Sequence, residues 1–204
     1  MGKSVLMRLS RSLRSSQETA RWTRSRLLAD EMNYYRARTN AVLRAVQLDK
    51  VELENGSEAM RKVVCHPGGV SAAILTDKNE ILFGRQIRYP YAQAVLECPA
   101  GKIESGEDPL EAMKRRQKEE TGTTSSRYLD LGKLYPTPGY CDEILHLYAC
   151  RIDSYGEKHL DEFLEVEKIP LAQAVEMAEK NEIFDAKTQV LILRAVRLVE
   201  RGEL

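Results

Sequence analysis

Short runs of apolar residues, each closed by a polar turn, recur along most of the chain. Such runs are typical of β-strands, and the turns contain the Gly, Pro, Asn and Asp residues that interrupt strands. Asn55-Gly56 is a strong turn signal, because this pair favours a tight hairpin. The pattern predicts strands at 42–53, 60–65, 70–75, 81–86, 94–97, 129–135 and 145–152.

Other segments carry helix signals and predict helices at 108–121, 171–180 and 188–201. The first has clear ends: Asp108 is a good N-cap, Pro109 suits the first turn, and Gly122 suits the C-terminal stop. Strands and helices mix without the regular alternation of a parallel doubly wound fold, so we expect an α+β fold. The apolar runs are shorter than the ~20 residues that span a bilayer, so no membrane partner is expected.

The charges divide the chain in two. The whole chain is neutral, but residues 1–40 carry nine Lys or Arg and only three Asp or Glu, and the rest holds the compensating acids. A basic, Ser-rich start is typical of a mitochondrial transit peptide. A solvated basic helix in the cytoplasm and an arm that binds nucleic acid are the alternatives. We therefore expect a basic extension at 1–40 and a folded domain at 41–204.

The segment 101–123 combines glycines with closely spaced charges. Its fixed positions are Gly101, Glu107, Arg115, Glu119, Glu120 and Gly122. On a helix, Glu119 and Glu120 share a face with Arg116, because residues three and four apart are neighbours. Carboxylates on one face form an oxygen-rich site for a hard divalent cation such as Mg²⁺, and a guanidinium in the same place repels that cation.

These positions are in register with the signature of the Nudix hydrolases, which the segment resembles. That signature has a metal-binding glutamate where this chain has Arg116, and an aliphatic residue where it has Gln117. The flanking motifs resemble the ADP-ribose pyrophosphatase branch of the family, over about residues 42–200. They are His66-Pro-Gly-Gly-Val70, Arg85-Gln-Ile-Arg88-Tyr-Pro90, Leu96-Glu-Cys-Pro-Ala-Gly101 and Tyr135-Pro-Thr-Pro-Gly-Tyr-Cys-Asp-Glu143.

The resemblance implies a fold, an activity and a partner. The fold is the Nudix α/β/α sandwich with a mixed sheet. The activity is hydrolysis of a nucleoside diphosphate linked to a sugar, with ADP-ribose giving AMP and ribose 5-phosphate and with Mg²⁺ or Mn²⁺ as cofactor. Enzymes of this branch are typically homodimers, so a second copy of the chain is an expected partner.

The resemblance also implies roles for single residues. The substrate would be bound by Arg88 at its diphosphate, by Glu143 at its terminal ribose and by Lys102. The metal would be bound by Ala100, through its carbonyl, and by Glu119 and Glu120. The catalytic residues would be Glu119 and Glu162, with Glu162 as general base and Asp161 or Glu165 as its alternatives.

Arg116 separates two functional hypotheses. Its side chain either swings outward or folds onto Glu119 and Glu120 as a substitute for the metal, and metal binding is expected to be weaker in both cases. The chain is then an enzyme that recruits other carboxylates, or a catalytically impaired Nudix domain that acts as a nucleotide- or RNA-binding or assembly module in mitochondria. Gln117 is expected to cost core packing, although its long amide can reach solvent.

Overall fold

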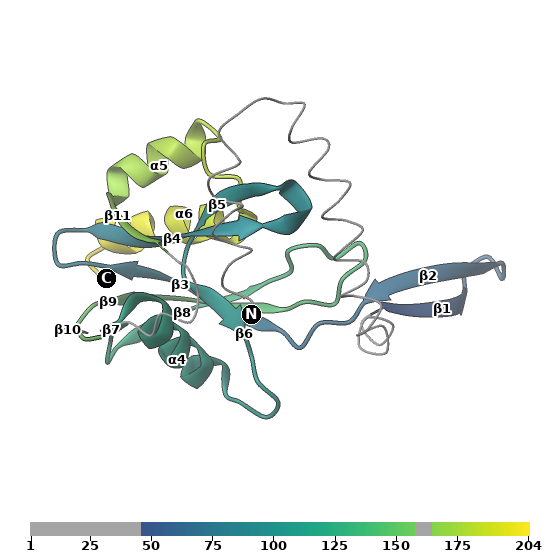
Figure 1. Ribbon diagram of the computed structural model, residues 1–204. Coiled ribbons are helices and arrows are strands. Elements are labelled where there is room, and N and C mark those ends of the chain that lie inside the picture. Colours follow the sequence, from purple (N-terminus) through teal and green to yellow (C-terminus); the bar gives the residue numbers. More distant parts are fainter. Residues whose placement is uncertain (1–45, 158–164) are drawn as a thin grey trace, which may run out of the picture. The chain divides into compact units, whose positions relative to one another are not determined.

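A mixed β-sheet forms the centre of the protein, whose structure is a computed structural model that describes residues 46–157 and 165–204 (Figure 1). Its strand order is β11-β4-β3-β9-β8, with β5 paired to β4 and β6 paired to β3. The pairing of β3 with β9 is parallel and the other pairings are antiparallel. The strands are β3 (Gly69–Leu75), β4 (Glu80–Arg88), β5 (Gln93–Glu97), β6 (Ala100–Lys102), β8 (Tyr128–Leu134), β9 (Leu145–Arg151) and β11 (Glu165–Pro170).

Helices cover both faces of this sheet (Figure 1). Helix α4 (Pro109–Thr121) lies on one face, and α5 (Leu171–Glu179) and α6 (Ala186–Glu200) lie on the other. Strand β3 is buried along its whole length, and successive side chains point to opposite faces. One core joins Val70, Ala72 and Ile74 to Ala112 and Met113 of α4, and the other joins Ala73 and Leu75 to Leu191 and Ile192 of α6. The predicted α/β/α sandwich with a mixed sheet is confirmed.

Two small sheets complete the described secondary structure. Strands β1 (Val46–Glu52) and β2 (Glu58–Val64) form the hairpin that Asn55-Gly56 predicts. Strands β7 (Thr123–Thr124) and β10 (Ser154–Tyr155) pair beside the end of α4, and a 3₁₀ turn, η1 (Tyr89–Tyr91), follows β4. The basic extension at 1–40 lies outside the described residues. Among the described residues, no helix is both long and apolar enough to cross a membrane.

The ends of α4 follow the sequence closely. The carboxylate of Asp108 accepts hydrogen bonds from the backbone N–H groups of Leu110 and Glu111, and Pro109 occupies the first turn. Gly122 ends the helix at φ 66°, a left-handed conformation that glycine adopts without strain. This helix is therefore fixed by its own sequence, which holds residues 116, 119 and 120 on one face.

The structure contains strands β6, β7, β10 and β11, which were not predicted, and α6 begins earlier than expected. Strand β11 was not predicted, because its apolar residues do not alternate strictly and its register comes from six residue pairs with β4. Helix α6 begins at Ala186 rather than at 188, because Asp185 caps it by accepting a hydrogen bond from the backbone of Thr188. Ala186 and Lys187, at the start of α6, line the cavity of the candidate site.

Candidate active site

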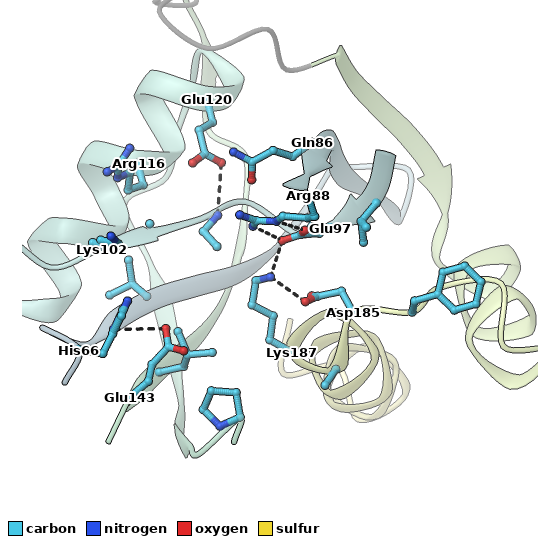
Figure 2. Close-up of a pocket in the computed structure, with 18 of the residues that line it drawn as sticks. His66, Gln86, Arg88, Glu97, Lys102, Arg116, Glu120, Glu143, Asp185 and Lys187 are labelled. Atoms are coloured by element: carbon cyan, nitrogen blue, oxygen red, sulfur yellow. Dashed lines mark hydrogen bonds and ion pairs between the residues drawn. The ribbon is translucent and has the colours of Figure 1, made fainter. Parts of the chain in front are cut away.

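A cavity of about 730 Å³ opens between β4, β5, β6, the face of α4 and the beginning of α6 (Figure 2). Its lining is rich in charge of both signs. The charged and polar side chains around it are His66, Gln86, Arg88, Gln93, Glu97, Lys102, Arg116, Glu120, Glu143, Asp185 and Lys187. Volumes of roughly 300–1,000 Å³ are typical of small-molecule sites. The cavity therefore suits a polar ligand of the size of a nucleotide.

A buried ion network forms one wall. Arg88 donates from Nε and Nη2 to the two carboxylate oxygens of Glu97, each at 2.6 Å. Lys187 donates to Glu97 at 2.5 Å and to Asp185 at 2.9 Å. Glu97 is only 7% exposed and Lys187 only 11% exposed, so both charges depend on these partners.

The network keeps its members charged. Burial alone would raise the pKa of Glu97, but the hydrogen bonds and charges of Arg88 and Lys187 outweigh it and hold that pKa below its ordinary value. Burial alone would lower the pKa of Lys187, but the nearby Asp185 and Glu97 carboxylates raise it above its ordinary value. Arg88 thus has a fixed orientation, and its Nη1 remains available to a ligand in the cavity.

Sequence reasoning missed three members of this wall: Glu97, Asp185 and Lys187. Asp185 was the available signal, because an aspartate just before a predicted helix is a good N-cap, and its side chain can accept the backbone N–H of Thr188, three residues later. Thr188 also donates its hydroxyl to Asp185 and accepts the backbone N–H of Cys98 at 2.8 Å. That bond joins the end of β5 to the start of α6, which are 90 residues apart in sequence.

Glu107 and Arg115 of the signature brace the loop before α4. Arg115 donates from Nε and Nη2 to the carboxylate of Glu107 at 2.8 and 2.7 Å. These hydrogen bonds lower the pKa of Glu107 to about 2. Arg115 also lies 3.4 Å from Glu119, one turn further along the helix. Both residues hold the loop against the helix and do not line the cavity.

Arg116 lies in the cavity and does not swing outward. Its side chain is 25% exposed and crosses Gly101, where a Cβ atom would lie under 3.0 Å from the Nε, Cδ and Cγ atoms of Arg116. Among the described residues, its buried Nε has no hydrogen-bond partner. Its Nη1 lies 3.5 Å from Glu119, a loose ion pair. Arg116 therefore folds inward, but it lies across Gly101 with Glu119 as a loose partner and is not folded onto both glutamates as expected.

The residues on α4 offer a divalent cation only a poor site. Glu119 is engaged by Arg115 and Arg116, and Glu120 accepts the backbone N–H of Ala100 at 3.2 Å. The guanidinium of Arg116 occupies the region between this helix and the loop at Gly101. Over the ranges 46–157 and 165–204, no group of three or more His, Cys, Asp or Glu side chains is placed to hold a metal. The helix thus carries the positively charged Arg116 at the position where the signature has a metal-binding glutamate.

The other predicted substrate residues also border the cavity. Glu143 and Lys102 line it together with Arg88. Glu143 lies 3.5 Å from Nδ1 of His66, and that nitrogen accepts the backbone N–H of Gly68 at 3.2 Å. The carboxylate of Glu143 thus borders the cavity, where it can accept hydrogen bonds from hydroxyl groups of a ligand.

The predicted general base is not among the described residues. Glu162 and its alternative Asp161 lie outside the ranges that the structure covers. Glu165, the other alternative, is the first residue of β11 and pairs with Arg85 of β4. The role of Glu162 stays a prediction.

Gln117 has a different role from the predicted one. It is completely buried, so the expectation that its amide reaches solvent is wrong. Its Nε2 donates to the hydroxyls of Thr123 and Ser125 at 3.0 and 2.9 Å, and its Oε1 accepts the hydroxyl of Tyr128. A satisfied polar cluster therefore replaces the aliphatic contact that the signature favours at this position.

Comparison with known proteins decides the family. A model of the NUDIX domain matches residues 66–190 of this chain. The chain belongs to the Nudix hydrolase family. This Nudix protein is 36% identical over 149 residues to an ADP-ribose pyrophosphatase of Bacillus subtilis (strain 168), a match that covers 71% of this chain and 80% of that one.

Two further similarities are informative. The chain is 36% identical to a methanol dehydrogenase activator of Bacillus methanolicus, with 72% of this chain and 82% of that one covered. The crystal structure of an ADP compounds hydrolase superimposes with a TM-score of 0.66 at 20% sequence identity, covering 78% of this chain and 88% of that one. The structural match supports the fold, and the sequence matches show which members of the family this chain is similar to.

Proposed function

We propose that this Nudix protein hydrolyses the diphosphate of a nucleoside diphosphate linked to a sugar, with ADP-ribose as the favoured substrate and AMP and ribose 5-phosphate as products. The observation that carries the proposal is the orientation of Arg88 in a nucleotide-sized cavity by the buried Glu97, which Lys187 also binds. The similarity to a protein named ADP-ribose pyrophosphatase supports the choice of substrate.

The residues of the cavity divide the work of binding. Nη1 of Arg88 donates to a phosphate oxygen, and the ion pair with Glu97 prevents the guanidinium from rotating away. Lys102 supplies a second positive charge at β6. Glu143 accepts hydroxyl groups of the terminal ribose. Glu162 takes the proton of the attacking water, as the motif comparison implies, and Glu119 supports catalysis from α4.

For the cofactor, we propose that turnover needs Mg²⁺ or Mn²⁺ and that the protein binds this cation weakly. The reason is the local charge: α4 offers Glu119 and Glu120, but the guanidinium of Arg116 lies beside them. A unit charge about 5 Å from a divalent ion costs roughly 6 kcal/mol at an effective dielectric constant of ~20. Activity is therefore expected to rise with cation concentration into the millimolar range without early saturation.

The test is AMP release from ADP-ribose by the purified protein, with GDP-mannose as a competing substrate. Three proteins are compared: the parent chain, Arg116→Glu and Lys118→Glu. Lys118 lies exposed on the same helix and does not line the cavity, so its charge reversal is the matched control. Activity in the parent that rises in Arg116→Glu alone supports the proposal. Absence of AMP release from all three proteins contradicts it.

A second candidate function is nucleotide binding with impaired turnover. Arg116 favours it, because it replaces a metal ligand by a cation and still leaves a formed cavity. In mitochondria, such a domain would act as a nucleotide- or RNA-binding or assembly module. Activity that appears only in Arg116→Glu, together with tight binding of ADP-ribose by the parent, distinguishes this function from the first.

Two proposals concern the chain's surroundings. The basic residues at 1–40 are proposed to direct the protein to mitochondria, the alternative being the cytoplasm. A fluorescent fusion lacking residues 1–27 should disperse into the cytoplasm, and continued mitochondrial location would contradict the transit peptide.

The chain is also proposed to form a homodimer, which light scattering after size-exclusion chromatography measures directly.

A further inference from the structure

The lysine and arginine side chains of the cavity fall into two groups. Arg88 and Lys187 are each hydrogen-bonded to a buried carboxylate, which neutralises them. The second group is Arg116 and Lys102, which make no hydrogen bond to a carboxylate within the described ranges. Both border Gly101: Lys102 follows it in β6, and Arg116 lies across it. The two cations thus face one stretch of the cavity wall (Figure 2).

Arg116 is incompletely satisfied in this position. Its Nε is buried without an acceptor in the part of the chain that the structure describes, and its nearest carboxylate, Glu119, lies 3.5 Å from Nη1 without a hydrogen bond. Glu119 is 39% exposed and is shared with Arg115, so it neutralises Arg116 poorly. A partly buried guanidinium with few partners is costly, and an anion bound at its exposed end would lower that cost.

Gly101 makes this arrangement possible. Because a Cβ atom at 101 would overlap three atoms of the arginine, only glycine lets the arginine stem pass between α4 and β6. Packing against Gly101, with only a loose ion pair to Glu119, therefore holds the guanidinium close to the loop. A planar guanidinium held in this way matches two oxygens of a phosphate.

We propose that Arg116, together with Lys102, binds the diphosphate of the nucleotide directly, so that binding needs no divalent cation. The inference rests on the substrate class proposed above and adds the means of recognition. The positive charge that a metal would bring to the phosphates is supplied by the protein. Nucleotide binding and turnover then have different cation requirements: binding proceeds in a chelator, and turnover depends on added metal.

The test separates binding from chemistry. Binding of a non-cleavable α,β-methylene analogue of ADP-ribose is measured by titration calorimetry, in EDTA and in Mg²⁺. The proteins are the parent chain, Arg116→Gln, Arg116→Glu and the control Lys118→Glu. Circular dichroism and thermal unfolding establish that each variant is folded. If Arg116→Gln fails to fold, Lys102→Gln provides the same comparison from an exposed residue.

The parent should bind the analogue about equally in both buffers. Arg116→Gln should weaken binding in EDTA by about 10- to 100-fold, the range of a charge-assisted hydrogen bond. Arg116→Glu should lose binding in EDTA and recover it in Mg²⁺, whereas Lys118→Glu should match the parent. Arg116→Glu thus weakens metal-free binding while it raises metal-dependent turnover, and these opposite signs identify the role of the charge.

Other outcomes would overturn the inference in distinguishable ways. If the parent binds only in Mg²⁺, Arg116 does not replace the cation, while the proposed hydrolysis still stands. If Arg116→Gln binds in EDTA as tightly as the parent, the diphosphate does not contact this side chain. If no protein binds the analogue in either buffer, both the substrate class and the inference fail.

Discussion

The side chain of Arg116 lies across the α-carbon of Gly101, and the space it fills is the space that any other residue at 101 would need for its Cβ. Gly101, a fixed glycine of the signature, is thus in contact with Arg116, which replaces a glutamate of the signature. The substitution therefore changes more than a metal ligand. It places a cation against the loop that borders the nucleotide cavity, and it makes the two positions interdependent.

We expect Gly101→Ala to destabilise the parent protein by about 1–3 kcal/mol, because overpacking forces the arginine out of its place. In an Arg116→Ala background, the same change should cost much less. Urea unfolding of the two single variants and the double variant measures the coupling. Additivity of the two effects within about 0.5 kcal/mol would show that the two residues do not share this space.

Gln117→Leu restores the aliphatic residue of the signature and should nevertheless destabilise the protein. It would remove the amide partner of the buried Thr123 hydroxyl and of the partly buried Ser125 and Tyr128 hydroxyls. The expected loss is about 1–3 kcal/mol in chemical unfolding. Tyr128→Phe removes a single bond of the cluster and should cost less. A more stable leucine variant would mean that the cluster contributes nothing.

Glu97→Gln should damage both stability and substrate binding. It leaves the partly exposed Arg88 without its carboxylate and the buried Lys187 with Asp185 alone, a loss of about 3 kcal/mol. The KM for ADP-ribose should rise about tenfold, because Arg88 loses its orientation. Glu167→Gln is the matched control, since Glu167 pairs with Arg85 of the same strand but is 29% exposed, against 7% for Glu97, and its loss should cost under about 1 kcal/mol.

Glu107 should contribute to resistance against acid. Hydrogen bonds from Arg115 lower its pKa to about 2, whereas an unfolded glutamate titrates near about 4.3. Because the folded pKa is the lower one, the stabilisation is fully present above about pH 4.3 and disappears as the pH falls toward about 2. The parent's advantage over Glu107→Gln should therefore be constant from neutral pH to about pH 5 and then shrink. An advantage that persists unchanged at about pH 2 would contradict the assignment.

Local features of the sequence were enough to predict the elements of the signature helix. Asp108, Pro109 and Gly122 define its ends through bonds and dihedral angles that involve only their neighbours. The burial of β3 follows in the same way from an unbroken run of small and apolar residues. The family could be predicted as well, because the fixed positions of 101–123 are in register with the signature that the segment resembles.

Strand β11 and the start of α6 were less accessible to such reasoning. The six pairs of β11 are made with a strand that is about 80 residues earlier in the chain, so the segment's own pattern is weak. The first turn of α6 depends on Asp185, whose carboxylate also reaches Lys187. Its value as a cap is local, but its place in the ion network depends on Glu97 from β5.

By itself, the sequence determined the family, the sandwich fold and the register of the signature, including the cation at 116. Only the tertiary structure decided that the Arg116 side chain lies across Gly101, that Gln117 is hydrogen-bonded in the core, and that Glu97 and Lys187 form a buried ion pair. The physical reason is that backbone conformation is largely set by near neighbours. The rotamer and the partner of a long polar side chain are set by the groups that packing brings beside it, whatever their distance along the chain.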